Sequence, residues 1–168
     1  MEINPREEAR TLLQEQEVGS APVKVDRIAR AMGIRIQFAP LGPDLSGMAH
    51  IKDGVSIIGV NSLHHPNRQR FTIAHEIGHF RMHRPILEGK VHVDRAVLRR
   101  DLRSSAGDQS VEIQANQFAS ELLVPEALLG PMLGDRIVDV EDAEAVAAIA
   151  KRFRVSEAVV KYRLLALD

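Results

Sequence analysis

Residues 71–80 read Phe-Thr-Ile-Ala-His-Glu-Ile-Gly-His-Phe, and the segment His75-Glu76-Ile77-Gly78-His79 within them decides the fold and the chemistry that the chain can support. A helix advances about 100° per residue, so His75 and His79 lie one turn apart on the same face and can reach the same metal ion. Glu76 points about 100° away, where it can accept a proton from water bound to the metal. The segment therefore predicts a zinc-dependent hydrolase site on a helix.

The residues around this segment predict that the helix is buried. They are apolar on most sides of the helix: Phe71, Ile73, Ala74, Ile77 and Phe80. Imidazoles and a carboxylate on a buried helix need partners, because unpaired buried polar groups are costly. A metal ion is the simplest partner that satisfies all three side chains.

Composition narrows the class of protein. The 168 residues include 22 basic and 23 acidic side chains and no cysteine. We expect one domain over 1–168, metal binding through His, Asp or Glu alone, and no direct binding to nucleic acid or to an anionic membrane. The chain lacks both a secretion signal and an apolar run of about 18 residues, so a cytoplasmic location is expected.

Hydrophobic periodicity and turn residues predict an α+β fold, mostly helical, with a small three-stranded sheet packed on the active-site helix. The sheet is expected over 34–61 and contains an antiparallel hairpin that turns at Asp53-Gly54. The expected helices are the active-site helix over 66–83, a second helix over 110–123 and a C-terminal pair over 142–167. The stretch 84–109 shows no clear period and is expected to be irregular, as a lid or a solvated charged segment.

A zinc hydrolase needs a third protein ligand and one open position. His83 is a poor candidate because an ideal helix carries it about 80° around from His75 and about 12 Å along the axis, so we expect it to act as a cation at the helix end. Glu112 is a better candidate, and Asn116, one turn later, could accept a hydrogen bond from a ligating histidine. Four other residues remain open as the third ligand: His50, His92, Asp94 and Asp108.

The group that would stabilise negative charge on the substrate oxygen is less clear. Three residues are candidates for this or for another substrate contact: His50, Arg70 and Tyr162. The strand near 48–51 could also pair with an extended substrate.

The chain resembles a known family over most of its length. The residues that carry the resemblance are 68–79, Glu112, Ala115-Asn116, Phe118-Ala119, Leu122-Leu123 and Pro125. They resemble the ImmA/IrrE family of metallopeptidases. The resemblance implies that His75, His79 and Glu112 bind a divalent metal, Zn²⁺ before Mn²⁺ or Fe²⁺, and that Glu76 is the catalytic glutamate. It also implies a protein substrate, a helix-turn-helix repressor of the Xre type, whose cleavage derepresses genes.

Two other functions belong to different classes. Residues 150–163 can be drawn as a helix-turn-helix with basic side chains, which would suit a DNA-binding regulator. A protein-binding, antitoxin-like module with a vestigial peptidase site is the other alternative. The intact Glu76 argues against the latter.

Overall fold

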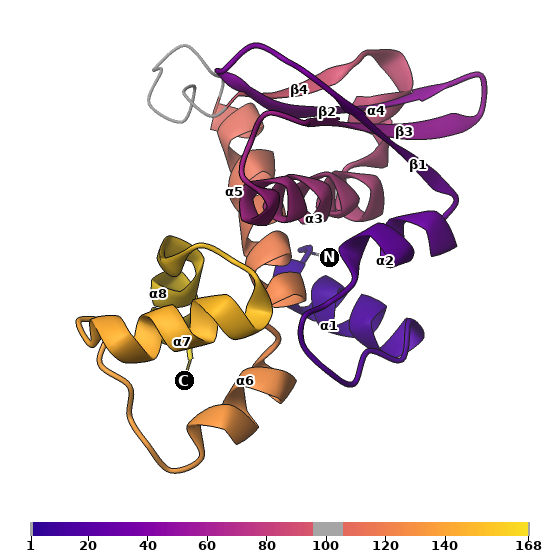
Figure 1. Cartoon of the computed structure of the whole chain (residues 1–168). Coiled ribbons are helices and arrows are strands. Elements are labelled where there is room, and N and C mark those ends of the chain that lie inside the picture. Colours follow the sequence, from indigo (N-terminus) through magenta and orange to yellow (C-terminus); the bar gives the residue numbers. More distant parts are fainter. Residues whose placement is uncertain (1, 96–105, 168) are drawn as a thin grey trace.

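The computed structural model describes residues 2–95 and 106–167. Its described residues form a single α+β unit, which confirms the predicted fold class (Figure 1). The strands are β1 (Ile34–Ala39), β2 (Leu45–Lys52), β3 (Val55–Asn61) and β4 (His92–Arg95). The helices are α1 (Pro5–Glu15), α2 (Val25–Ala31), α3 (Pro66–Met82), α4 (Arg84–Gly89), α5 (Ala106–Leu123), α6 (Glu126–Leu133), α7 (Ala143–Phe153) and α8 (Glu157–Leu165).

The sheet has the strand order β1-β3-β2-β4, with β1 parallel to β3 and the other two pairings antiparallel. The β2–β3 hairpin turns where the sequence predicts, because Asp53 and Gly54 adopt φ angles of 51° and 76°, as the tight turns that match strand twist require.

The number of strands differs from the predicted three. β4 is the fourth, and both β4 and α4 come from the stretch 84–109 that was expected to be irregular. Four residues are too few to show a period, and three of these four, His92, Asp94 and Arg95, are polar. Of the rest of that stretch, 106–109 form the start of α5, which begins before the predicted residue 110, and 96–105 lie outside the described residues, so the expectation of a lid is not addressed. β4 also covers the side of β2 that was expected to pair with substrate, so that expectation is wrong.

Helix α3 lies between the sheet and α5 (Figure 1). Two glycines permit this close packing. A Cβ atom on Gly47 of β2 would lie 2.5 Å from Cγ2 of Thr72 in α3, and one on Gly78 would lie 3.0 Å from the ring of Phe118 in α5. The first distance is shorter than side-chain carbon atoms tolerate and the second is tighter than most such contacts, so these glycines help to set how near the sheet and α5 approach the catalytic helix.

The C-terminal helix pair is tied to the start of α3. Arg70 donates hydrogen bonds to the carbonyl oxygens of Phe153 (3.3 Å) and Arg154 (3.2 Å), at the end of α7. Asn67 donates to the carbonyl oxygen of Val155 at 3.3 Å. These bonds satisfy carbonyl groups that a helix leaves without partners at its end.

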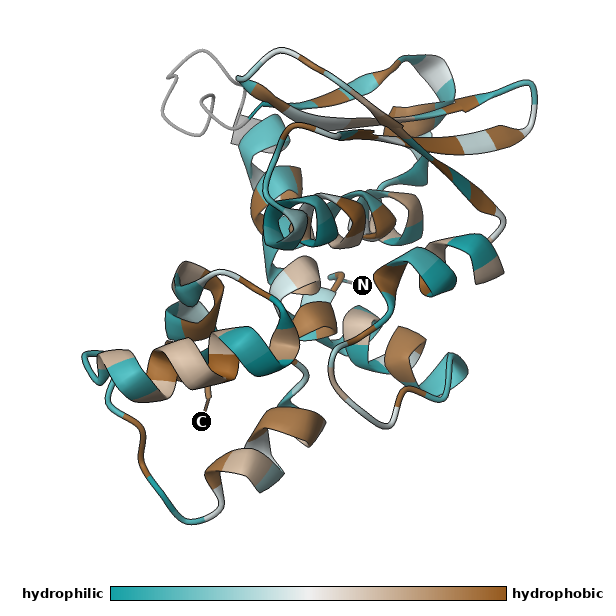
Figure 2. Cartoon of the chain, viewed as in Figure 1, coloured by the Kyte–Doolittle hydropathy of each residue, from teal (hydrophilic) through white to brown (hydrophobic). Residues whose placement is uncertain are grey.

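The opposite side of this pair contacts the end of α5. Arg163 of α8 is 1% exposed, donates to the carbonyl oxygen of Val124 at 3.0 Å and pairs with Glu121 of α5 at 2.7 Å. α6 follows α5 and is coloured mostly as hydrophobic in Figure 2, although Leu129 is its one fully buried side chain. In the part of the chain that the structure describes, no helix has the length and hydropathy needed to cross a bilayer.

Candidate metal centre

Helices α3 and α5 bring three of the predicted ligands together. His75 and His79 are fully buried on α3, and their Nε2 atoms lie 3.1 Å apart. Glu112, from the first half of α5, places Oε2 3.1 Å from Nε2 of His75 and Oε1 3.0 Å from Nε2 of His79. Ala115 and Ala119 of α5 are completely buried, and their small side chains let the two helices approach.

The outer nitrogens of the two histidines have partners that define their tautomers. Nδ1 of His75 lies 2.9 Å from Oδ1 of Asn116, an acceptor, so this nitrogen carries the proton. Nδ1 of His79 lies 3.0 Å from Nδ1 of His83, whose Nε2 lies 2.7 Å from Oε1 of Gln114. Because Gln114 offers an oxygen, His83 donates from Nε2 and accepts from His79 at Nδ1. His83 is thus a hydrogen-bond partner of His79, whereas the sequence suggested a cation at the helix end.

These tautomers leave bare lone pairs on the two Nε2 atoms, which face each other and the Glu112 carboxylate at 3.0–3.1 Å. Atoms that all carry lone pairs repel one another at this spacing unless a cation or a proton lies between them. Ligands about 2.0–2.1 Å from a tetrahedral zinc ion lie about 3.3 Å apart, close to the spacing of these atoms. The residues therefore fit a divalent metal ion.

The same crowding shifts the pKa values of the metal-free protein. Burial lowers the pKa of both histidines, but the carboxylate of Glu112, with Asp94 and Glu76, raises that of His75 to about 9. Burial dominates at His79, beside the positive charge of His75, and its pKa falls to about 4. The raised pKa of His75 favours a proton on this imidazole, in the place where a cation fits.

Glu76 is fully buried beside this cluster, and neither of its carboxylate oxygens has a hydrogen-bond partner among the described residues. Burial raises its pKa to about 8, although His75 and His92 act in the opposite direction. Asp94 of β4 completes a second group, in which one donor atom each of His75, Glu76 and Asp94 lie within 4.8 Å of one another. A carboxylate in this position can exchange a proton with a small molecule that enters the cluster.

His92 of β4 reaches the cluster from the sheet. Its Nε2 atom lies 3.0 Å from Oε1 of Glu112, and its ring centroid lies 4.3 Å from that of His79. The sequence named His92 among several open candidates for the third ligand, but nothing in the local pattern indicated its place. The pairing of β4 with β2 brings it there.

Other candidates lie elsewhere. The guanidinium of Arg70 is held by the carbonyl groups at the end of α7. Ala49 points into the core, so His50, the next residue of β2, points to the opposite face of the sheet, away from α3. Asp108 is exposed on the first turns of α5 and does not belong to the cluster. Neither His50 nor Arg70 is therefore placed to contact a substrate oxygen at the metal centre.

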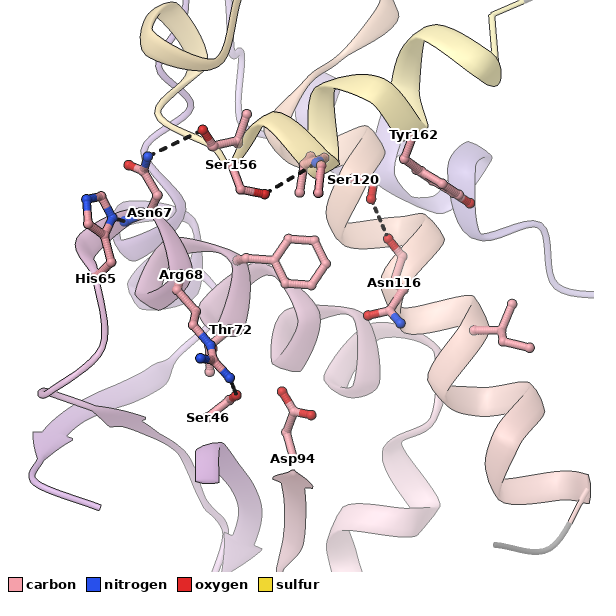
Figure 3. Close-up of a pocket in the computed structure, with 15 residues that line it drawn as sticks. Ser46, His65, Asn67, Arg68, Thr72, Asp94, Asn116, Ser120, Ser156 and Tyr162 are labelled. Carbon is pink, nitrogen blue, oxygen red and sulfur yellow. Dashed lines mark hydrogen bonds between the residues drawn. The ribbon is translucent and has the colours of Figure 1, made fainter. Parts of the chain in front are cut away.

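Tyr162 lies at a cavity of about 790 Å³ that adjoins the metal centre (Figure 3). Residues of α3, α5 and α8 form its walls, and Ser46 and Asp94 of the sheet lie at one end. Asn116, which orients His75, and Asp94 belong both to this cavity and to the surroundings of the metal centre.

The family of the chain follows from its similarity to known proteins. The chain matches the IrrE N-terminal-like domain over residues 29–165. The chain belongs to this family. The resemblance to ImmA/IrrE metallopeptidases is thereby confirmed.

Two similar proteins extend this result. The chain is 33% identical over 150 residues to the radiation response metalloprotease IrrE of Deinococcus radiodurans, a match that covers 82% of this chain and 38% of that protein. The chain thus spans well under half the length of the curated relative that it matches. A solved structure of a Mycobacterium tuberculosis transcriptional regulator superposes with a TM-score of 0.64 at 16% identity, covering 95% of this chain and 45% of the other. At that identity the likeness concerns the fold alone.

Proposed function

We propose that this IrrE-like domain is a zinc-dependent endopeptidase that hydrolyses a peptide bond in a protein substrate. One observation carries the proposal: three donor groups converge at 3.0–3.1 Å with bare lone pairs, beside a buried carboxylate that has no hydrogen-bond partner in the described part of the chain. In the proposal His75, His79 and Glu112 hold the metal, and Asn116 and His83 orient the two imidazoles. His and Glu donors also suit Mn²⁺ or Fe²⁺, so metal analysis belongs in the test.

A metal bound at these residues would polarise the substrate carbonyl and lower the pKa of a water molecule. Glu76 would accept the proton of that water and transfer it to the nitrogen of the departing amine. Its position suits both steps, because its carboxylate lies beside the proposed ligands and has no hydrogen-bond partner among the described residues that would hold it away from the water.

His92 would supply the donor that the sequence did not identify. Its Nε2 lies 3.0 Å from the ligand Glu112, on the side of the centre formed by the sheet. An N–H group there can donate to the oxygen of the scissile carbonyl as negative charge develops on it, an interaction worth about 10²–10³-fold in kcat in other enzymes. We expect His92→Ala to lower kcat by about this factor while metal content stays at one per chain.

The proposed substrate is a helix-turn-helix repressor of the Xre type in the cytoplasm, and this part of the proposal rests on the family resemblance. The C-terminal helices do not favour the alternative of a DNA-binding regulator. Val155, Val159 and Tyr162 line the cavity beside the metal centre, and Arg163 is buried against Glu121. A recognition helix would need such residues at a DNA groove.

The test uses the metal-loaded protein and its Glu76→Gln variant with Xre-type repressors, beginning with any encoded beside the gene. Metal content is measured for both proteins. Cleavage by the unmodified protein and none by the metal-bound variant would support the proposal. Binding of metal and repressor by both proteins without cleavage, also at raised enzyme concentration, would identify a binding module instead.

A further inference from the structure

The cavity beside the metal centre is apolar on its walls. Its apolar residues come from three helices and from the turn before α8: Phe71, Ile113, Val155, Ala158, Val159 and Tyr162. Ile113 is 51% exposed and Tyr162 is 40% exposed, high values for large apolar side chains. At about 790 Å³ the cavity is large enough for several residues of a peptide, and it lies within the range of ligand sites in proteins.

The cavity lies beside the proposed catalytic centre, because Asp94 lines the cavity and also places its carboxylate within 4.8 Å of donor atoms of His75 and Glu76. The ring of Phe71, one turn before His75 on α3, lies 6.4 Å from that imidazole between centroids. Asn116 lines the cavity and also bonds to His75 at 2.9 Å. A peptide with its scissile bond at the metal centre would therefore extend directly into this space.

A buried acceptor at the inner end of the cavity indicates a peptide as its occupant. Asp94 is 6% exposed and lines the cavity, and no hydrogen bond or ion pair joins its side chain to another described residue. Figure 3 shows its carboxylate pointing into the space below α3, toward the cavity. Because Asp94 lines the cavity, its carboxylate can accept hydrogen bonds from the amide N–H groups of a peptide backbone, which a hydrocarbon ligand does not offer.

We infer that this cavity binds the substrate segment next to the scissile bond and selects a large aliphatic side chain there, with α8 as its outer wall. Val159, half-buried near the middle of the cavity-facing side of α8, is the specificity-determining residue. This inference rests on the proposed peptidase function and adds its substrate preference. It also assigns the C-terminal helix pair to substrate binding.

The test measures binding without requiring cleavage. The probes are N-acetyl-leucine hydroxamate and isobutylsuccinyl hydroxamate, which both chelate a metal through the hydroxamate. Each compound carries one isobutyl group, and the two groups lie on opposite sides of the chelating group. Their parents, N-acetylglycine hydroxamate and succinyl hydroxamate, lack it. Calorimetry on the zinc-loaded protein should show one isobutyl compound binding about 10- to 100-fold more tightly than its parent, as expected for burial of a side chain of that size.

Two substitutions on α8 separate the cavity from the rest of the helix. Val159→Trp fills the cavity and should remove the preference for the isobutyl compound, while affinity for its parent stays within about threefold. Leu165→Trp introduces the same bulk at a position that is 75% exposed and outside the cavity, so the preference should remain. Val159→Asp is a second cavity variant, which should abolish the preference through charge.

Each outcome of the hydroxamate titrations bears on a different part of the proposal. If no hydroxamate binds the zinc-loaded protein, the metal centre and the proposed function fail together. If the parents bind but neither isobutyl compound binds more than about threefold more tightly, the metal centre stands and the inference about the cavity is overturned. A preference that survives both Val159 variants would overturn the assignment of Val159.

Discussion

Helix α5 carries two carboxylates with opposite surroundings, the buried Glu121 and the half-buried Glu112. Glu121, near its end, faces Arg163 at 2.7 Å and Arg10 at 3.4 Å, both permanently charged, and accepts a hydrogen bond from the backbone of Glu126 at 3.2 Å. Glu112, in its first half, faces three imidazoles at 3.0–3.1 Å that carry charge only when protonated.

The difference in their surroundings distinguishes the cluster around Glu121, which stabilises the fold, from the cluster around Glu112, which can bind a cation. The cations around Glu121 belong to the protein, so this cluster is complete in the folded chain and ties α8 and α1 to α5. The group around Glu112 is balanced only when a proton or a cation from solution lies between its atoms. Buried polar clusters that depend on an exchangeable partner are candidate functional sites, and those with built-in partners are structural.

Removing a built-in cation should have the largest effect. Arg163→Met leaves Glu121 buried with the longer contact to Arg10 and the backbone hydrogen bond from Glu126, and we expect the free energy of unfolding to fall by about 3–5 kcal/mol in urea titrations. The double variant Arg163→Met/Glu121→Leu should recover most of the loss, because no buried charge is left unpaired. A loss below about 1 kcal/mol in the single variant would contradict the structural role.

Adding the exchangeable cation should stabilise the chain through the cluster that contains Glu112 and not through the cluster that contains Glu121. Zinc at about 100 times its dissociation constant should raise the free energy of unfolding of the unmodified, previously chelated protein by about 2.7 kcal/mol. Glu112→Gln should lose this increment, whereas Glu121→Gln should keep it despite a less stable starting point. Thermal unfolding with and without zinc measures both, and equal increments in the two variants would refute the assignment.

The partners of the ligating histidines should have smaller effects. Removing the acceptor for His79 in His83→Ala, or that for His75 in Asn116→Ala, should weaken zinc binding by about 10- to 100-fold in competition with a chromophoric chelator. His83→Gln should retain part of the affinity, because its amide oxygen can accept the same hydrogen bond. Unchanged affinity in His83→Ala would show that the contact with His79 does not orient the ligand.

A surface ion pair should have the smallest effect and should depend on pH. The hydrogen bonds from Arg81 at 2.8 and 2.9 Å lower the pKa of the exposed Glu15 below its ordinary 4.5. The folded protein therefore binds this proton less tightly than the unfolded chain, so the contribution is complete above pH 4.5 and is lost as the pH falls through the folded-state value.

Comparing the unmodified protein with Glu15→Gln by thermal unfolding should show a small difference at pH 6 that shrinks toward pH 3 and decreases with added salt. A difference that grows as the pH falls would have the wrong sign for this pair.

Local patterns in the sequence were sufficient for most elements of the fold. The Asp53-Gly54 turn, the start of α3 at Pro66 and the end of α5 before Pro125 all lie where turn and helix signals predict, because these signals act over a few residues. β4 was missed because a strand of four residues has too little sequence to show alternation. Its pairing with β2 supplies the evidence that its own residues lack.

The residues of the candidate site also divide into those that the local sequence placed and those that only tertiary contacts placed. The sequence by itself determined the spacing of His75, Glu76 and His79, because one helical turn is enough to place two imidazoles together and a carboxylate beside them. Glu112 could be named from its place on the second helix and from the family resemblance, but only the tertiary structure decided that His92 and Asp94 join it around them, and that α8 forms a wall of the adjoining cavity. Those contacts join segments far apart in the chain, and they depend on strand pairing and helix packing that no local pattern encodes.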